Sequence, residues 1–195
     1  MFKSTRHTLT TCLAAGLMST GLISSVAMAS DGKHSTYGWV EKVTIDPSWG
    51  PEVKAKLDTG ALTSSMQAEN IEEFERDGED WVRFDVEVED EATDDTISKT
   101  FEREVVRKLA LSGAGGEDSR PAVLMTVCVG GEFYEEQFSL RDRDGMIYPV
   151  LLGRRTIQDL GAVDVTQTFM HDADCDDDSP VHEYKDKEYD EDIGA

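Results

Sequence analysis

Residues 81–89 read Trp-Val-Arg-Phe-Asp-Val-Glu-Val-Glu and alternate strictly between apolar and polar side chains. Successive side chains of a β-strand point to opposite faces, so this period of two predicts a strand with one buried face. The acidic segment 90–96 predicts a turn, and residues 97–106 predict the strand that returns from it. This pattern favours a mainly β fold built from hairpins.

Further strands are predicted wherever short apolar or alternating runs lie between turn-forming residues. They cover residues 38–45, 53–57, 64–68, 122–129, 133–140, 148–153 and 162–169. Turns are expected at 46–51, at Gly130-Gly131 and at 141–145, and a Gly-rich flexible connector at 112–118. Helical structure is expected in the polar stretch 70–76 and over 156–160, where Gly161 provides the C-terminal cap.

The two ends of the chain differ in composition from its middle. Residues 1–29 have a basic start, an apolar run and a final Ala-Met-Ala, which is typical of a secretory signal peptide. Residues 30–37 read as a flexible leader and residues 38–170 as one domain. Residues 171–195 hold eleven acids and two lysines, so we predict a disordered acidic tail there.

The charge balance restricts the partners of the protein. The chain has 41 acids against 19 bases, a net charge of −22. Such a surface repels nucleic acid, and no later segment is apolar enough for stable membrane insertion. We therefore expect a secreted or periplasmic protein. Whether Cys128 and Cys175 pair stays open, with free thiols as the default, because the sequence sets no distance between them.

The predicted strand 53–57 leads into Asp58-Thr59-Gly60-Ala61. An Asp at a strand end supplies a rigidly held carboxylate for acid–base chemistry, and the Gly permits close approach of another backbone. The same residues are also common in ordinary turns, so the tripeptide alone proves little.

A second segment far downstream makes the first one more specific. Leu57–Ala61 early and Val150-Leu151-Leu152-Gly153-Arg154 late, followed by a short helix, resemble the retropepsin-type aspartic peptidases. Residues 54–65, 123–131 and 148–155 also resemble a bacterial family often labelled ATP-dependent zinc protease and associated with ribosomal-modification-type glutamate ligases. The resemblance implies a retropepsin-like closed β-barrel, one half of an acid protease, with one short C-terminal helix.

The resemblance also implies a mechanism. Retropepsin-like domains carry one catalytic Asp each and form homodimers, so Asp58 would work beside a second Asp58 to hydrolyse a peptide or protein substrate with an activated water. The hairpin over 81–106 is the expected flap. The residues that would support Asp58 are Thr59, Gly60, Ala61, Leu152, Gly153 and Arg154.

No metal or cofactor is expected from the residues themselves. The histidines beyond the signal peptide are His34, His171 and His182, all outside the core, and the sequence has neither a His-Glu-x-x-His motif nor a phosphate-binding loop. Leu62 stands where viral relatives often carry an acid, which leaves the partner of Arg154 open. A non-catalytic module that binds a peptide or an envelope protein is the alternative function, and a metal-dependent hydrolase is a weaker one.

Overall fold

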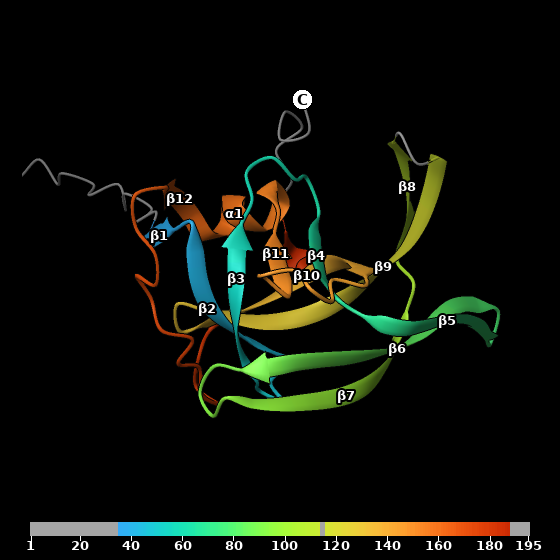
Figure 1. Cartoon of the computed structure of the whole chain (residues 1–195), viewed down its shortest axis with the longest axis horizontal. Coiled ribbons are helices and arrows are strands. Elements are labelled where there is room, and N and C mark those ends of the chain that lie inside the picture. The colour runs from blue at the N-terminus through green and yellow to red at the C-terminus, as the bar shows by residue number, and fades with distance from the viewer. Residues whose placement is uncertain (1–34, 114–115, 188–195) are drawn as a thin grey trace, which may run out of the picture. The chain divides into compact units, whose positions relative to one another are not determined.

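The computed structural model describes residues 35–113 and 116–187 (Figure 1). Within them the chain is mainly β, with one α-helix and one short 3-10 helix. The predicted signal peptide and most of the predicted leader lie outside the described residues and stay predictions. In the described part of the chain, no helix is long and apolar enough to span a membrane.

Six strands close into a barrel. Their order around it is β10-β4-β11-β3-β2-β9, and pairing of β9 with β10 completes the ring. Alternation sets the inner face: in β3, Val53, Ala55 and Leu57 are buried, while Lys54 and Lys56 lie on the outer face. The barrel strands are β2 (Val40–Ile45), β3 (Glu52–Leu57), β4 (Ser64–Gln67), β9 (Gly116–Val129), β10 (Glu132–Arg141) and β11 (Val150–Leu152). The predicted mainly β, closed-barrel fold is confirmed.

A three-stranded antiparallel sheet packs on the barrel. It consists of β5 (Glu69–Arg76), β6 (Glu79–Asp90) and β7 (Asp95–Glu104). The alternating residues of β6 bury Val82, Phe84, Val86 and Val88 in the common core, as predicted. The helical turn predicted over 70–76 is wrong, because this segment is β5. A tight turn at Asp77-Gly78, both with positive φ, returns the chain so that Phe74 pairs with Trp81.

The Gly-rich segment continues a hairpin instead of forming a connector. β8 (Arg107–Gly113) pairs with β9 in an unbroken register from Arg107↔Ala122 to Gly113↔Gly116. The prediction of a flexible connector is therefore wrong for the paired residues, while 114–115 lie outside the described residues. Figure 1 shows this hairpin extending from the barrel wall.

The predicted short helix is present as α1 (Arg154–Leu160), which ends at Gly161. β12 (Gly161–Asp164) then pairs in parallel with β1 (Ser35–Gly38), so 35–37 are not part of a flexible leader. Only glycine fits at 161, because φ is 133° and a Cβ would lie 2.2 Å from the Ser35 carbonyl oxygen. The last predicted strand, 162–169, is shorter than expected.

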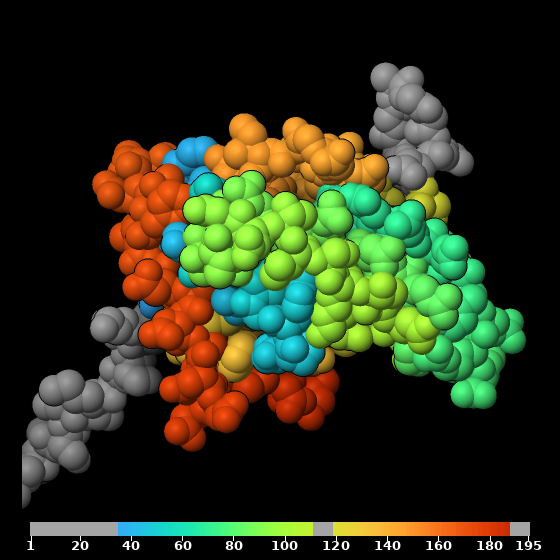
Figure 2. All heavy atoms as spheres, turned by 60° about the horizontal axis from the view of Figure 1, so that its bottom comes forward, coloured from blue at the N-terminus to red at the C-terminus, as the bar shows by residue number. Residues whose placement is uncertain are grey.

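The acidic segment after Met170 is structured as far as residue 187. It contains β13 (Val181–His182) and the 3-10 helix η1 (Tyr184–Asp186), and Cys175 forms a disulfide with Cys128 of β9. Figure 2 shows this end of the chain, orange to red, lying beside the blue N-terminal strands. The predictions of a disordered tail and of free thiols do not hold for these residues. Composition could not reveal the contacts that hold the segment, and residues 188–195 lie outside the described part.

Candidate active site

Asp58 stands at the end of β3, where the two segments singled out in the sequence meet. β3 and β11 pair in parallel with Leu57 opposite Leu152. The Asp58 backbone N–H donates to the Leu152 carbonyl oxygen at 2.8 Å. The structure thus brings together residues almost a hundred positions apart, and it holds the Asp58 backbone on a barrel strand.

The turn after Asp58 folds back onto its carboxylate. The Gly60 N–H donates to Asp58 Oδ1 at 2.9 Å, and the Ala61 N–H donates to the Asp58 carbonyl oxygen at 3.1 Å. Thr59 and Gly60 are exposed, and the Asp58 side chain is about one quarter exposed. The carboxylate is therefore fixed in orientation and still open to solvent.

Gly153 supports this loop from below. A Cβ on Gly153 would lie 2.7 Å from the Thr63 carbonyl carbon and 2.9 Å from that of Leu62, so only glycine allows the two segments to cross so closely. The Gly153 N–H donates to Ser64 Oγ at 3.0 Å, and Ser64 Oγ lies 2.7 Å from Thr156 Oγ1 of α1. These buried contacts tie the loop to the helix.

Arg154 extends the support. Its backbone N–H donates to the Ala61 carbonyl oxygen at 2.8 Å, and its Nη1 donates to the Thr59 carbonyl oxygen at 2.9 Å. The partner that the sequence left open thus includes a backbone carbonyl of the Asp58 turn. The supporting residues predicted from the sequence lie around Asp58 in one continuous structure.

Lys56 is a neighbour that the site prediction missed. Its Nζ lies 3.1 Å from Asp58 Oδ2, since residues two apart on a strand share a face. Burial is the largest single influence on the Asp58 pKa and raises it, but the hydrogen bonds from Lys56 and Gly60, the charge of Lys56 and the Ala61 N–H together outweigh it. The net result is a lowered pKa, so Asp58 is ionised at neutral pH.

An arginine-lined cavity of about 410 Å³ adjoins the loop. Its lining includes Ala61, Leu62 and Thr63 of the loop and four arginines. These arginines are Arg107, Arg120, Arg141 and Arg143. We call this cavity the arginine pocket.

The charges of the arginine pocket lie close enough to influence one another. Burial lowers the pKa of Arg143, Arg141 and Arg120 lower it further, and Asp58 opposes them. Ser65 also lines the pocket, and its buried Oγ has no hydrogen-bond partner among the described residues. In so acidic a protein, this pocket is a place where an anionic group can bind. No local motif announces it, because its arginines come from β8, β9, β10 and the segment after β10.

The expected flap needs correction. The hairpin β6–β7 has its inner face in the core, with Phe84 stacked on Phe101 at 5.7 Å. The arginine pocket beside the Asp58 loop is lined in part by β8 and β9, through Arg107, Leu109 and Arg120, and its described lining includes no residue of β6 or β7. The β8–β9 hairpin is therefore the one that borders the candidate site.

A family model described as RimB-like, retropepsin-like aspartic endopeptidase RimB, matches residues 36–174. The chain belongs to this family. The match spans the barrel, the Asp58 loop, α1 and the start of the acidic segment.

One solved structure and several curated proteins are similar to this chain. A Legionella pneumophila protein of unknown function, with a crystal structure, is 36% identical, covers 70% of this chain and 97% of its own, and superposes with a TM-score of 0.57. A Shewanella pealeana protein named probable alpha-L-glutamate ligase is 36% identical over 120 residues, 61% of this chain. A Desulfotalea psychrophila protein of the same name is 34% identical over 115 residues. The matched segment spans about a quarter of these curated relatives, 26% and 24%.

Among residues 35–113 and 116–187, no group of three or more His, Cys, Asp or Glu side chains has the arrangement of a metal site. The candidate site of this family member consists of a carboxylate, a lysine and a pocket of arginines.

Proposed function

We propose that this protein is an exported aspartic endopeptidase that acts as a homodimer, with one Asp58 from each copy. The observation that carries the proposal is the Asp58 carboxylate, held ionised by Lys56 and Gly60 on an exposed turn that Gly153 supports from below. One chain supplies one such carboxylate, and two are needed to divide the roles of acid and base.

In this mechanism the two Asp58 side chains share one proton. Two carboxylates in contact cannot both ionise, so one pKa rises, the other falls, and the pair titrates as a unit. The ionised copy takes a proton from water while the water oxygen bonds to the scissile carbonyl carbon. The protonated copy donates its proton to the carbonyl oxygen. Collapse of the diol then breaks the C–N bond, and the amine leaves with a proton from the carboxyl pair.

The arginine pocket indicates which peptides would be favoured. Arg107 and Arg143 can bind a carboxylate by charge-assisted hydrogen bonds, and Ser65 Oγ offers one more donor. We propose that an acidic side chain next to the scissile bond occupies this pocket. The curated relatives are named probable alpha-L-glutamate ligases, and glutamate carries an acidic side chain of the type proposed here.

The proposed export rests on the signal-like residues 1–29 and is supported by the Cys128–Cys175 disulfide. Disulfides persist mainly in oxidising compartments such as the bacterial periplasm. Finding the protein in the cytoplasmic fraction, with residues 1–29 retained, would refute this part of the proposal.

The test uses protein purified from the periplasm of an expression host and a peptide library that includes glutamate-rich members. We expect cleavage that resists EDTA and a native mass of two chains. Asp58→Asn should lower kcat/KM by about 10²–10⁴-fold. The matched control is Asp77→Asn, in the β5–β6 turn, where φ is 56° and Asn fits. Undiminished cleavage by Asp58→Asn would refute the catalytic role of Asp58.

The alternative is a module that binds peptides or envelope proteins without cutting them. The arginine pocket favours it as much as catalysis, because binding an acidic peptide needs no second Asp58. Wild type that binds a glutamate-rich peptide, leaves it intact and keeps this affinity in Asp58→Asn would establish the alternative.

A further inference from the structure

The acidic segment 171–187, which we call the C-terminal strap, is fastened along the barrel wall. Besides the Cys128–Cys175 disulfide, β13 pairs in parallel with β10, and the Phe133 N–H donates to the Pro180 carbonyl oxygen at 2.8 Å. The His182 ring stacks on Tyr134 at 4.5 Å between centroids. So many specific contacts fix the position of the strap on the barrel.

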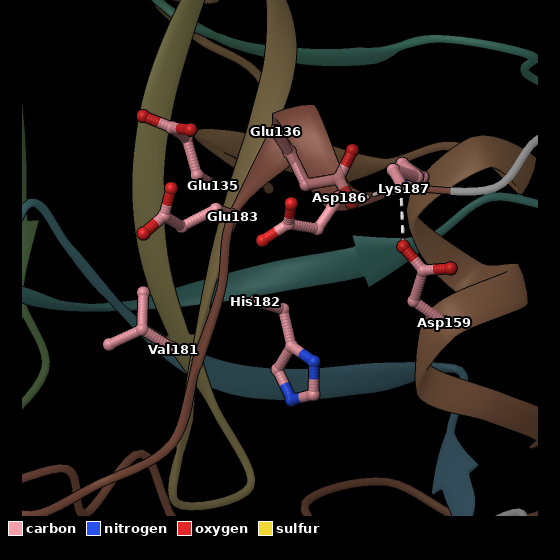
Figure 3. A pocket seen from close by; sticks show the side chains of 8 residues that line it. All are labelled: Glu135, Glu136, Asp159, Val181, His182, Glu183, Asp186 and Lys187. Atoms are coloured by element: carbon pink, nitrogen blue, oxygen red, sulfur yellow. Dashed lines mark hydrogen bonds and ion pairs between the residues drawn. The ribbon is translucent and has the colours of Figure 1, made fainter.

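A buried lysine anchors the far end of the strap. The Lys187 side chain is 3% exposed, and its Nζ pairs with Glu136 of β10 and with Asp159 of α1, the latter at 2.7 Å. Figure 3 shows Lys187 beside Glu136 and reaching Asp159 in an acid-lined cavity of about 430 Å³. Without the lysine, two carboxylates would face each other in a partly buried space, so the strap stabilises this wall.

Between the disulfide and Lys187, side-chain hydrogen bonds connect the strap to the arginine pocket. Gln137 Nε2 donates to the Tyr184 hydroxyl at 2.6 Å, and Gln137 Oε1 accepts from Arg107 Nε at 2.6 Å. Arg107 Nη2 in turn donates to Thr63 Oγ1 at 2.7 Å. The path thus leads from the strap to the pocket and ends on the loop that carries Asp58.

We propose that the C-terminal strap is a positioning element of the arginine pocket, with Tyr184 acting as a positioning residue for Arg107 through Gln137. An amide has a donor end and an acceptor end, so a hydroxyl that accepts from Nε2 turns Oε1 toward Arg107. Held at Nε by Gln137 and at Nη2 by Thr63, the planar guanidinium has one orientation in the pocket. The inference rests on the proposed binding of an acidic side chain there.

The test compares Tyr184→Phe, which removes only the hydroxyl, with Lys185→Gln as the matched control. Lys185 follows in the same turn and forms an ion pair with its neighbour Glu183. With a glutamate-containing peptide, we expect Tyr184→Phe to raise KM by about 3–10-fold, the value of one hydrogen bond, with kcat unchanged. With the glutamine version of that peptide, KM should not change. In the Arg107→Gln background, Tyr184→Phe should have no further effect.

A second measurement needs no activity. In wild type the Arg107 Nε–H should exchange slowly with solvent in ¹⁵N NMR spectra, and in Tyr184→Phe it should exchange faster, while Lys185→Gln matches wild type. Unchanged exchange, or an unchanged KM for the glutamate peptide, overturns the inference even if the protein is an active peptidase. If wild type binds this peptide without cutting it, the peptidase proposal fails and a rise in Kd for Tyr184→Phe supports the inference. If wild type does not bind it at all, the proposed acidic specificity and the inference fail, while cleavage of other library peptides would still support the peptidase proposal.

Discussion

Removing the Cys128–Cys175 disulfide should cost a large part of the stability of the fold. The two cysteines are 47 residues apart, and a cross-link over a loop of this length lowers the entropy of the unfolded chain by the equivalent of about 4 kcal/mol. Cys175→Ser is the suitable variant because it leaves the fully buried Cys128 as a small apolar thiol. With a urea m-value of about 2 kcal/mol per molar, the unfolding midpoint should fall by about 2 M.

The assay is urea unfolding at constant pH, followed by tryptophan fluorescence and circular dichroism. Oxidised wild type, wild type with a dithiol reductant, and Cys175→Ser with and without reductant are compared. Reduced wild type should unfold at the same urea concentration as Cys175→Ser, and reductant should not change the unfolding midpoint of the variant. A loss of unfolding free energy below about 1 kcal/mol in Cys175→Ser would refute the loop-entropy reasoning. Other contacts would then hold the strap in the unfolded state as well as in the folded one.

Two further predictions concern titration. Lys56→Met removes a hydrogen bond that lowers the Asp58 pKa, so the acid limb of the profile of kcat/KM against pH should move to higher pH. Lys54→Met, on the same face of β3, is the control. Equal pH profiles for the two variants would contradict the role of Lys56. Burial raises the pKa of Glu136 from an ordinary 4.5 to about 7, although Lys187 opposes this rise. Between pH 4.5 and about pH 7, Glu136 therefore carries a proton in the native state that it lacks in the unfolded state. Stability should therefore fall as pH rises from about 4.5 to about 7, by at most about 3 kcal/mol. Glu136→Gln should flatten this slope in urea midpoints, and an equally steep slope in the variant would contradict it.

The sequence predicted elements whose signal is local. The alternation of residues 81–89 gave β6, and Gly130-Gly131, with φ of 61° and 83°, forms the expected hairpin turn. Where the signal depended on a partner strand, prediction failed. Residues 70–76 have few apolar side chains, and only pairing with β6 makes them a strand. The Gly-rich residues at the end of β8 likewise form a strand only through β9.

Much of the candidate site was readable from the chain itself, because the Asp58 turn and the Gly153 crossing each need particular residues at fixed spacing. Gly153 is required by sterics, because a Cβ there would meet the carbonyl carbons of Leu62 and Thr63. The arginine pocket and the strap had no such signal. Arg107 and Arg143 belong to different elements, and Lys187 lies in a segment whose composition alone predicts disorder. Only closure of the barrel decides which of these charges meet, since a long-range contact leaves no periodicity in the sequence.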